Sequence, residues 1–270
     1  MKIACVGDSI TEGTGLSNPA LESYPARLQR LLGTNSIVRN YGVSGRTLLK
    51  KGDFPYWKEP FFTQSHNWLP DIVIIQLGTN DSKPQNWKYG TNFVSDYEDL
   101  IASYSSLSSA PKILVCTPCP VYGNGAYDIK PGIVATNIAP EVEDIAQRLD
   151  LDLIDLQTRL AGHSELFPDT VHPNSKGMVA MSAIMFNALA DGPPAGDPPA
   201  AIIRRVSTTK VELSWPAAWG GLVPQSTTAL KSSNSVWTIV ETTLPYGDGD
   251  WVRQTNSSAG SPRFFRLWRP

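Results

Sequence analysis

The chain has 270 residues, of which 41% are hydrophobic and 18% charged, so it is long enough for one or two domains and too apolar to be disordered. Its net charge of −2 implies neither nucleic acid nor an anionic membrane as a partner, and no stretch approaches the roughly 18 apolar residues of a membrane helix. The charge is uneven, with a balance of −6 over residues 1–200 and +4 over residues 201–270. This asymmetry favours two structural units.

The first two thirds of the chain alternate between two kinds of apolar pattern. Short β-branched runs predict strands at residues 3–6, 36–41, 72–77, 113–117 and 151–156. Helical spacing of apolar residues predicts helices within residues 24–32, 97–107, 142–149 and 178–189. This order predicts an α/β fold, a flavodoxin-like three-layer sandwich with a five-stranded parallel sheet and helices on both faces. Three further stretches are predicted to be long loops, of a length that usually has a functional role: residues 46–70, 81–94 and 118–134.

The last third of the chain has a different pattern. A Pro- and Gly-rich segment, residues 192–199, predicts a linker between a large first domain at 1–191 and a smaller module at 200–270. Strand-like segments at 211–215, 236–240, 251–254 and 264–268 predict a small all-β module. It holds five of the eight tryptophans, which could form either a sugar-binding platform or, more commonly, the core: Trp215, Trp219, Trp237, Trp251 and Trp268.

Three cysteines, Cys5, Cys116 and Cys119, are too few for a disulfide scaffold in a chain of this length. The spacing of Cys116 and Cys119 is that of a redox or zinc pair, but a zinc site needs a second pair of ligands, which the sequence lacks. Cys5 lies within an apolar run and Cys116 at the end of another. This placement favours buried structural thiols over a local disulfide or a redox role.

A serine directly follows the first predicted strand, in the segment GDSI at residues 7–10. A strand that ends in this tight turn places Ser9 at the C-terminal edge of the sheet, where open α/β folds build their sites. Gly-Asp-Ser is also ordinary turn chemistry, so the serine gains meaning only through its partners. A nucleophilic serine needs a base, a carboxylate that orients the base, and an oxyanion hole.

Three histidines are candidates for the base. His66 and His163 lie in polar sequence predicted as loops, without a nearby motif. His172 follows Asp169 by three residues in the segment DTVHPN, and a turn there allows Asp169 to orient the imidazole while its other nitrogen takes the proton of Ser9. The alternative is a loop aspartate that caps its own turn beside a surface histidine.

Two further segments supply candidate oxyanion donors. Gly45 ends the segment NYGVSG after the second predicted strand, and its N–H would face substrate without a side chain in the way. Asn80 lies in the segment GTND after the third strand, and its side-chain amide could point to the same place. Because both follow ends of parallel strands, one edge of the sheet can hold them together with Ser9.

These four blocks, in this order, resemble the GDSL or SGNH hydrolase family over about residues 1–190. The resemblance implies a flavodoxin-like sheet and a catalytic triad of Ser9, His172 and Asp169. It also implies an oxyanion hole formed by the N–H of Ser9, the N–H of Gly45 and the side chain of Asn80. No metal and no organic cofactor is implied.

The substrate class is less sharply indicated. Asp8 and the loop aromatics Tyr56, Trp57 and Trp87 are candidate substrate contacts, because aromatic rings can stack on sugars or hold an acyl group; they could equally fill loop cores. Residues 40–47 and 117–123 resemble those of bacterial sialate or carbohydrate O-acetylesterases. The leading hypothesis is therefore removal of O-acetyl groups from a carbohydrate.

Several alternatives stay open. They are a broad short-chain carboxylesterase or arylesterase, a lysophospholipase or thioesterase, and a non-catalytic carbohydrate-binding protein. The expected partner is a small-molecule or polysaccharide ester. No signal peptide is visible, yet the low lysine content and the many Trp and Pro residues suit a secreted or periplasmic protein.

Overall fold

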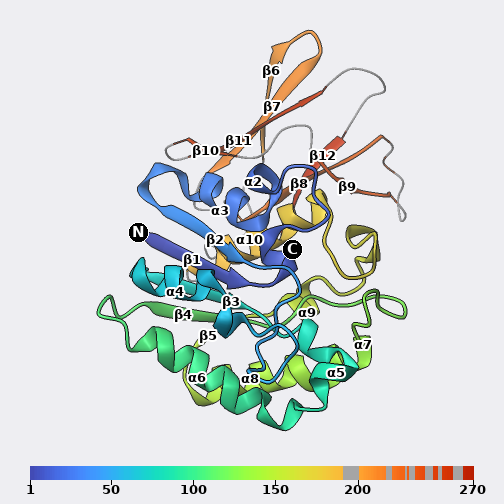
Figure 1. Cartoon of the computed structure of the whole chain (residues 1–270). Coiled ribbons are helices and arrows are strands. Elements are labelled where there is room, and N and C mark those ends of the chain that lie inside the picture. The colour runs from blue at the N-terminus through green and yellow to red at the C-terminus, as the bar shows by residue number, and fades with distance from the viewer. Residues whose placement is uncertain are drawn as a thin grey trace. The chain divides into compact units, whose positions relative to one another are not determined.

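The computed structural model describes residues 1–190, 201–216, 221–228, 230, 235–240, 246–248, 251–257 and 264–270 (Figure 1). The chain divides into two compact units. The first comprises Met1–Ala26 and Ser36–Asn174, and the second comprises Arg27–Asn35 and Ser175–Pro270. The predicted linker at 192–199 and Trp219 lie outside the described residues, and the predicted domain boundaries stay a prediction.

The first unit is built on a five-stranded parallel sheet. Its strands are β1 (Lys2–Gly7), β2 (Ile37–Gly42), β3 (Ile72–Gln76), β4 (Lys112–Cys116) and β5 (Asp152–Ile154), in the order β2-β1-β3-β4-β5. Every neighbouring pair runs parallel, so the predicted fold class is confirmed. The direction of strand order reverses beside β1, and ligands of open α/β sheets bind at the carboxyl ends of strands at such a point.

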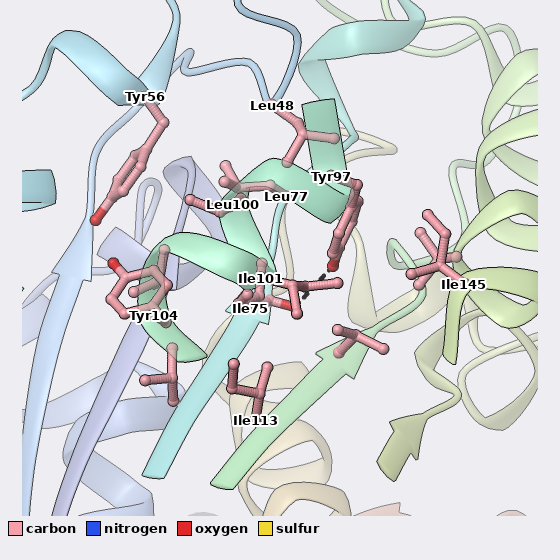
Figure 2. Close-up of a cluster of buried hydrophobic side chains, with 14 of the residues drawn as sticks. Leu48, Tyr56, Ile75, Leu77, Tyr97, Leu100, Ile101, Tyr104, Ile113 and Ile145 are labelled. Carbon is pink, nitrogen blue, oxygen red and sulfur yellow. Dashed lines mark hydrogen bonds between the residues drawn. The ribbon is translucent and has the colours of Figure 1, made fainter. Parts of the chain in front are cut away.

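Three helices of the first unit pack on one face of this sheet: α4 (Pro60–Asn67), α6 (Phe93–Ser105) and α8 (Ala139–Arg148). Alternate residues of the strands, such as Ile75 and Ile113, point into this layer and meet Leu100 and Tyr104 of α6 and Ile145 of α8 (Figure 2). All of these side chains are buried. The period of two along the strands and the helical spacing on α6 and α8 therefore produce one continuous apolar core.

The other predicted helices are α3 (Tyr24–Leu32) and α10 (Ser175–Leu189), and both are observed. α3 ends before Gly33, whose φ of +67° suits the left-handed stop expected there. Short helices complete the chain: α1 (Ser9–Glu12), α2 (Pro19–Glu22), α5 (Pro84–Trp87), α7 (Pro131–Ile133) and α9 (Leu156–Arg159), a π-helix at Val134–Ile138, and 3-10 turns at Gly33–Asn35, Tyr56–Lys58, Asn80–Ser82, Gly90–Asn92 and Ser164–Leu166.

The prediction of a loop throughout residues 46–70 was wrong, because α4 lies within this segment. The stretches 81–94 and 118–134 likewise contain the short helices α5 and α7. Pro60 begins α4, but the segment is too short for its helical periodicity to stand out from sequence. His66 therefore lies on a helix and not in a loop. Its Nδ1 lies 2.7 Å from the carbonyl oxygen of Phe62, and its ring stacks on Tyr104 at a centroid distance of 4.0 Å.

All three cysteines are buried thiols, which confirms the structural interpretation. Burial raises the pKa of Cys5 to about 12 and raises the pKa of Cys119 above its ordinary value. Because the thiolate is the reactive form, thiols with raised pKa values are inert at neutral pH.

The described residues of the second unit include two antiparallel sheets. One has the order β10-β11-β7-β6 and the other β12-β8-β9, built from β6 (Ile202–Ser207), β7 (Lys210–Pro216), β8 (Val223–Thr227), β9 (Thr238–Ile239), β10 (Tyr246–Asp248), β11 (Trp251–Ser257) and β12 (Phe264–Trp268). Three of the four predicted strand segments lie within strands, and the fourth, 236–240, contains the two-residue strand β9. Trp215 is fully buried, and Trp237 and Trp268 are half-buried, which favours a core role for Trp215.

Candidate active site

Ser9 is the first residue of α1, directly after β1. Asp8 caps this short helix, because its carboxylate accepts the N–H of Ile10 at 2.9 Å. Gly13 ends it with φ +98°. The strand, the cap and the glycine stop thus hold the Ser9 hydroxyl at the carboxyl edge of the sheet, where the sequence places it.

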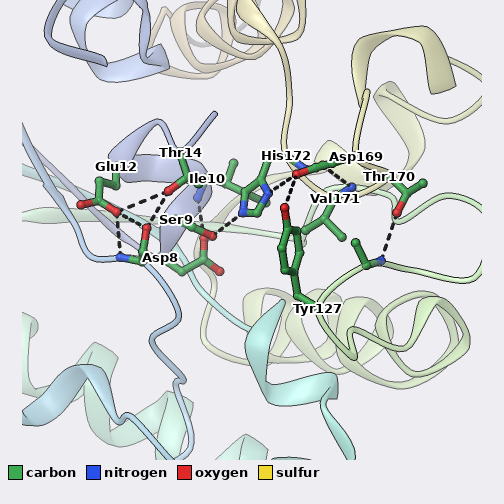
Figure 3. Close-up of polar contacts among 12 residues, drawn as sticks. Asp8, Ser9, Ile10, Glu12, Thr14, Tyr127, Asp169, Thr170, Val171 and His172 are labelled. Atoms are coloured by element: carbon green, nitrogen blue, oxygen red, sulfur yellow. Dashed lines mark hydrogen bonds and ion pairs between the residues drawn. The ribbon is translucent and has the colours of Figure 1, made fainter. Parts of the chain in front are cut away.

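His172 bridges Ser9 and Asp169 (Figure 3). Its Nε2 lies 2.9 Å from the Ser9 Oγ, and its Nδ1 lies 2.7 Å from the Asp169 Oδ2. The other carboxylate oxygen, Asp169 Oδ1, accepts the backbone N–H groups of Val171 at 3.0 Å and of His172 at 2.7 Å. Asp169 therefore caps its own turn, as in the alternative interpretation, and also holds the imidazole, but His172 is buried and is not a surface histidine.

These contacts set the charge of Asp169. Partial burial alone would raise its pKa, but hydrogen bonds from the N–H and ring of His172 and from the N–H of Val171 outweigh burial and lower the pKa. The carboxylate is therefore ionised at neutral pH and accepts the Nδ1–H of His172. That hydrogen bond selects the tautomer whose Nε2 is free to take a proton from Ser9.

A cavity of about 240 Å³ opens at this point. Its wall includes Ser9, His172, Gly45 and Asn80, which come from four separate segments of the first unit. All four sequence-predicted blocks therefore meet at one place, as expected for segments that follow or lie beside the carboxyl ends of parallel strands.

The backbone N–H groups of Ser9 and Gly45, both at the cavity, have no hydrogen-bond partner within the part of the chain that the structure describes. Gly45 has φ +79°, a conformation that L side chains rarely adopt, and a Cβ there would project into open space. The Asn80 Nδ2 donates to the Arg46 carbonyl oxygen at 3.1 Å and lies 3.4 Å from the Asp8 Oδ2. The long contact to Asp8 leaves one amide hydrogen weakly engaged at the cavity.

Two buried carboxyls lie behind the cavity wall. Burial raises the pKa values of Asp8 and Asp81 to about 7, although backbone N–H groups partly oppose the shift. Asp81 accepts the N–H groups of Leu48 at 3.0 Å and Leu49 at 2.7 Å. It thereby fixes the segment that follows Gly45, which explains why the GTND block carries an aspartate after Asn80.

The raised pKa of Asp8 predicts that stability depends on pH. The native state holds the Asp8 proton up to about pH 7, whereas the unfolded chain releases it near 3.8. Native protein binds more protons in between, so the free energy of unfolding falls as pH rises, by at most about 1.4 kcal/mol per pH unit. Asp8→Asn, which stays neutral, should flatten this fall, measured by urea unfolding at pH 5 and pH 8.

The exposed Asp99→Asn is the matched control and should keep the wild-type pH dependence. Asp81 contributes a dependence of the same sign, so the Asp8→Asn variant should retain part of it. An Asp8→Asn protein that loses as much stability as wild type between the two pH values would contradict the assignment.

The predicted aromatic substrate contacts are not in the cavity wall. Tyr56 is fully buried, and its hydroxyl donates to the Tyr41 carbonyl oxygen at 2.7 Å. The Trp57 Nε1–H donates to the Leu48 carbonyl oxygen at 2.7 Å, and Trp87 packs on Phe93. These three predictions are corrected, because the rings fill the cores of the long loops. Asp8 lies beneath the cavity, with no exposed surface.

Other wall residues were not predicted from sequence. Thr14 and Ser44 place hydroxyls at the cavity, 2.6 Å apart, and Glu12 accepts the Ser44 N–H at 2.9 Å. Lys83 and Tyr127 also line the wall. The segment at 118–134 was predicted as a functional loop, but no motif marked Tyr127 within it.

Nothing in the described ranges suggests a metal centre, since no three His, Cys, Asp or Glu side chains there gather closely enough to hold an ion. Likewise, no helix within those ranges combines the length and apolar character needed to cross a membrane.

A family model and several known proteins are similar to this chain. The model of the GDSL-like lipase/acylhydrolase family matches residues 5–180. An acetylxylan esterase of Xylanibacter ruminicola is 37% identical over 207 residues, which cover 70% of this chain and 43% of that protein. The chain thus spans less than half the length of this relative.

Solved structures share the fold. A carbohydrate acetylesterase family member from Sinorhizobium meliloti matches with a TM-score of 0.59 and 22% identity over 70% of this chain and 97% of its own. The aryl esterase of M. smegmatis matches with a TM-score of 0.53 and 20% identity over 67% and 96%. These two structural matches establish the fold alone, whereas the match to the family model covers all four sequence blocks. The chain therefore belongs to the GDSL-like lipase/acylhydrolase family, a family of ester hydrolases, as those blocks predicted.

Proposed function

We propose that the protein is a serine esterase that removes O-acetyl groups from a carbohydrate through an acyl-enzyme. The observation that carries the proposal is the continuous hydrogen-bonded chain from Ser9 through His172 to Asp169 at the wall of the cavity. A nucleophile, a base and an orienting carboxylate in this geometry are the arrangement that acyl transfer requires.

The reaction follows from the contacts. The Ser9 Oγ attacks the ester carbonyl carbon while the His172 Nε2 accepts its proton, and Asp169 stabilises the imidazolium that forms. The tetrahedral intermediate collapses when the alcohol oxygen leaves with the proton from His172, and the acyl group stays on Ser9. Water then attacks the acyl-enzyme by the same route, which releases acetate and restores Ser9.

Three donors converge on the position of the developing oxyanion: the N–H groups of Ser9 and Gly45 and the amide of Asn80. The loosely held hydrogen of the Asn80 Nδ2, 3.4 Å from Asp8, can turn to the substrate oxygen as negative charge develops. Fixed donors of this kind lower the barrier because they need no reorganisation during the reaction.

Asn80→Ala is therefore expected to lower kcat by about 100- to 1000-fold with little change in KM, since the lost donor acts mainly in the transition state. Steady-state kinetics on p-nitrophenyl acetate measure this effect. Asn92→Ala, at a half-buried residue before α6 and outside the cavity wall, is the control and should keep wild-type kcat. A kcat within twofold of wild type for Asn80→Ala would remove Asn80 from the oxyanion hole.

Three observations support an acetyl ester of a sugar as substrate. The cavity, at about 240 Å³, is smaller than the roughly 300–1,000 Å³ that holds drug-sized ligands, which favours a small acyl group. The Thr14 and Ser44 hydroxyls in its wall can hydrogen-bond sugar hydroxyls. The 37% identical relative is named an acetylxylan esterase, which accords with this substrate class.

A direct test compares acetate release from acetylated xylan and O-acetylated sialic acid with hydrolysis of p-nitrophenyl esters of increasing chain length. The proposal expects acetate from at least one acetylated carbohydrate and rates on aryl esters that fall beyond short acyl chains. Activity that is highest on acyl chains of about six carbons or longer, with no acetate released from the sugars, would contradict the proposal. It would indicate a lipid-type or thioester substrate.

A polymeric carbohydrate substrate also supports action outside the cytoplasm, so we propose a secreted or periplasmic protein. Fractionation of the native source organism, with the protein detected by antibody, tests this location. Detection in the cytoplasmic fraction alone would contradict it.

A further inference from the structure

Tyr127 is an aromatic residue at the cavity to which the mechanism above gives no role. It lies in the segment between β4 and α7, is 61% exposed, and forms part of the cavity wall. Its hydroxyl donates to the Asp169 Oδ2 at 3.1 Å, and its ring meets the His172 ring edge to face at a centroid distance of 5.4 Å (Figure 3). One side chain therefore touches two members of the triad and also faces solvent.

The segment that contains Tyr127 is hydrogen-bonded to the turn that contains Asp169 and His172. The Tyr122 N–H donates to the Thr170 carbonyl oxygen at 2.9 Å, and the Ala126 N–H donates to the Thr170 Oγ1 at 3.1 Å. Thr170 lies between Asp169 and His172 in the chain, with φ +74°. The position of Tyr127 is thus coupled directly to the geometry of the Asp-x-x-His turn.

The backbone at Tyr127 is in an unfavourable conformation. Tyr127 and Asp128 have φ values of +56° and +61°, although neither is glycine. Two consecutive left-handed residues of this kind are rare, because the Cβ crowds the backbone. Such conformations persist where the surroundings impose them, and they cluster at functional sites. Here they direct the Tyr127 ring toward His172 and the cavity.

The hydroxyl of Tyr127 shares an acceptor with the base. The Asp169 Oδ2 receives the Nδ1–H of His172 at 2.7 Å and the Tyr127 O–H at 3.1 Å, while Oδ1 holds the turn. The hydrogen bond to Asp169 raises the pKa of Tyr127, so the phenol stays a donor at working pH. A second donor on Oδ2 restricts rotation of the carboxylate and takes up part of its negative charge.

We propose that Tyr127 is a positioning residue for the Asp169–His172 pair and that its exposed ring is the surface on which the sugar of the acetylated substrate lies. The first half rests on the contacts with Asp169 and His172, and the second half rests on the proposed function as well. Sugar rings present apolar C–H faces that pack on an exposed aromatic ring. Substrate binding and the geometry of the base are then linked through one side chain.

The variants Tyr127→Phe and Tyr127→Ala test the positioning role and the sugar-stacking role separately. The kinetics of both are measured on p-nitrophenyl acetate and on an acetylated xylo-oligosaccharide. Tyr127→Phe keeps the ring and loses the hydroxyl, so kcat should fall about tenfold on both substrates without a change in sugar KM. The acid limb of its kcat/KM profile should move to higher pH, since Asp169 then holds more negative charge beside the imidazolium. Tyr127→Ala should also raise the sugar KM about tenfold but change the aryl-ester KM less.

Tyr89→Phe, on a half-buried tyrosine outside the cavity wall, is the matched control and should leave kcat, KM and the pH profile unchanged. Because Tyr127 is exposed, both variants should melt within a few degrees of wild type; Tyr127→Phe alone tests the positioning role if the alanine variant does not fold.

Unchanged kcat and acid limb in Tyr127→Phe would overturn the positioning role. Equal sugar KM values for the phenylalanine and alanine variants would overturn the stacking role. If wild type hydrolyses the aryl ester but releases acetate from no sugar, the proposed function and the stacking role both fail, while the aryl ester still decides the positioning role.

Discussion

Ser9→Ala is expected to lower kcat for ester hydrolysis by about five orders of magnitude or more, the scale seen when the nucleophile of a triad is removed. The reason is that the Ser9 Oγ forms the covalent bond to the acyl group, and no other hydroxyl lies within hydrogen-bond reach of the His172 Nε2 among the described residues. The residual rate would come from the oxyanion donors and from substrate binding alone.

The measurement is kcat on p-nitrophenyl acetate for purified Ser9→Ala, with the exposed Ser95→Ala on α6 as the control. The control should keep wild-type kcat. Because Ser9 is small and 7% exposed, the alanine variant should fold and retain its melting temperature. A folded Ser9→Ala enzyme with kcat within about tenfold of wild type would show that another group carries the reaction.

Asp169→Asn is expected to have the second largest effect, a loss of about 10⁴-fold in kcat, as in other triads that depend on this carboxylate. The amide oxygen can still accept the N–H groups of Val171 and His172, so the turn should persist. The amide NH₂ then faces the His172 Nδ1 and favours the tautomer with a proton on Nε2. In that tautomer the ring cannot accept the proton of Ser9.

The control is Asp155→Asn, another aspartate that caps a helix, since it accepts the Thr158 N–H at 2.9 Å before α9. It should leave kcat unchanged. Asp169→Asn with more than a tenth of wild-type kcat would make the carboxylate dispensable in this protein.

The sheet and the convergence of the four blocks could be predicted because both depend on local pattern. Apolar runs such as residues 72–77 identify buried parallel strands, and the carboxyl ends of such strands share one edge. Once Ser9, Gly45 and Asn80 are placed after or beside strand ends, their proximity follows from topology. The spacing of Asp169 and His172 supplies the last block, because a single turn brings both side chains together.

What the sequence could not reveal depends on contacts between distant residues. Tyr56 and Trp57 are aromatic residues of the kind that bind sugars, so the sequence predicted substrate contacts. Instead, their side chains donate hydrogen bonds to the Tyr41 and Leu48 carbonyl oxygens and pack inside the protein. Tyr127 had no motif, and its direction is set by a left-handed backbone and by ties to Thr170. Sequence periodicity carries no information about such long-range partners.

The most direct test of the central claim, that the Ser9 Oγ is a nucleophile activated by His172, is covalent trapping of the folded protein with an organophosphorus ester. Mass spectrometry should find one adduct per chain, on the peptide that contains Ser9, and neither Ser9→Ala nor His172→Ala should be labelled at a comparable rate. An unchanged mass of the native protein, or an adduct on any other residue, would contradict the account.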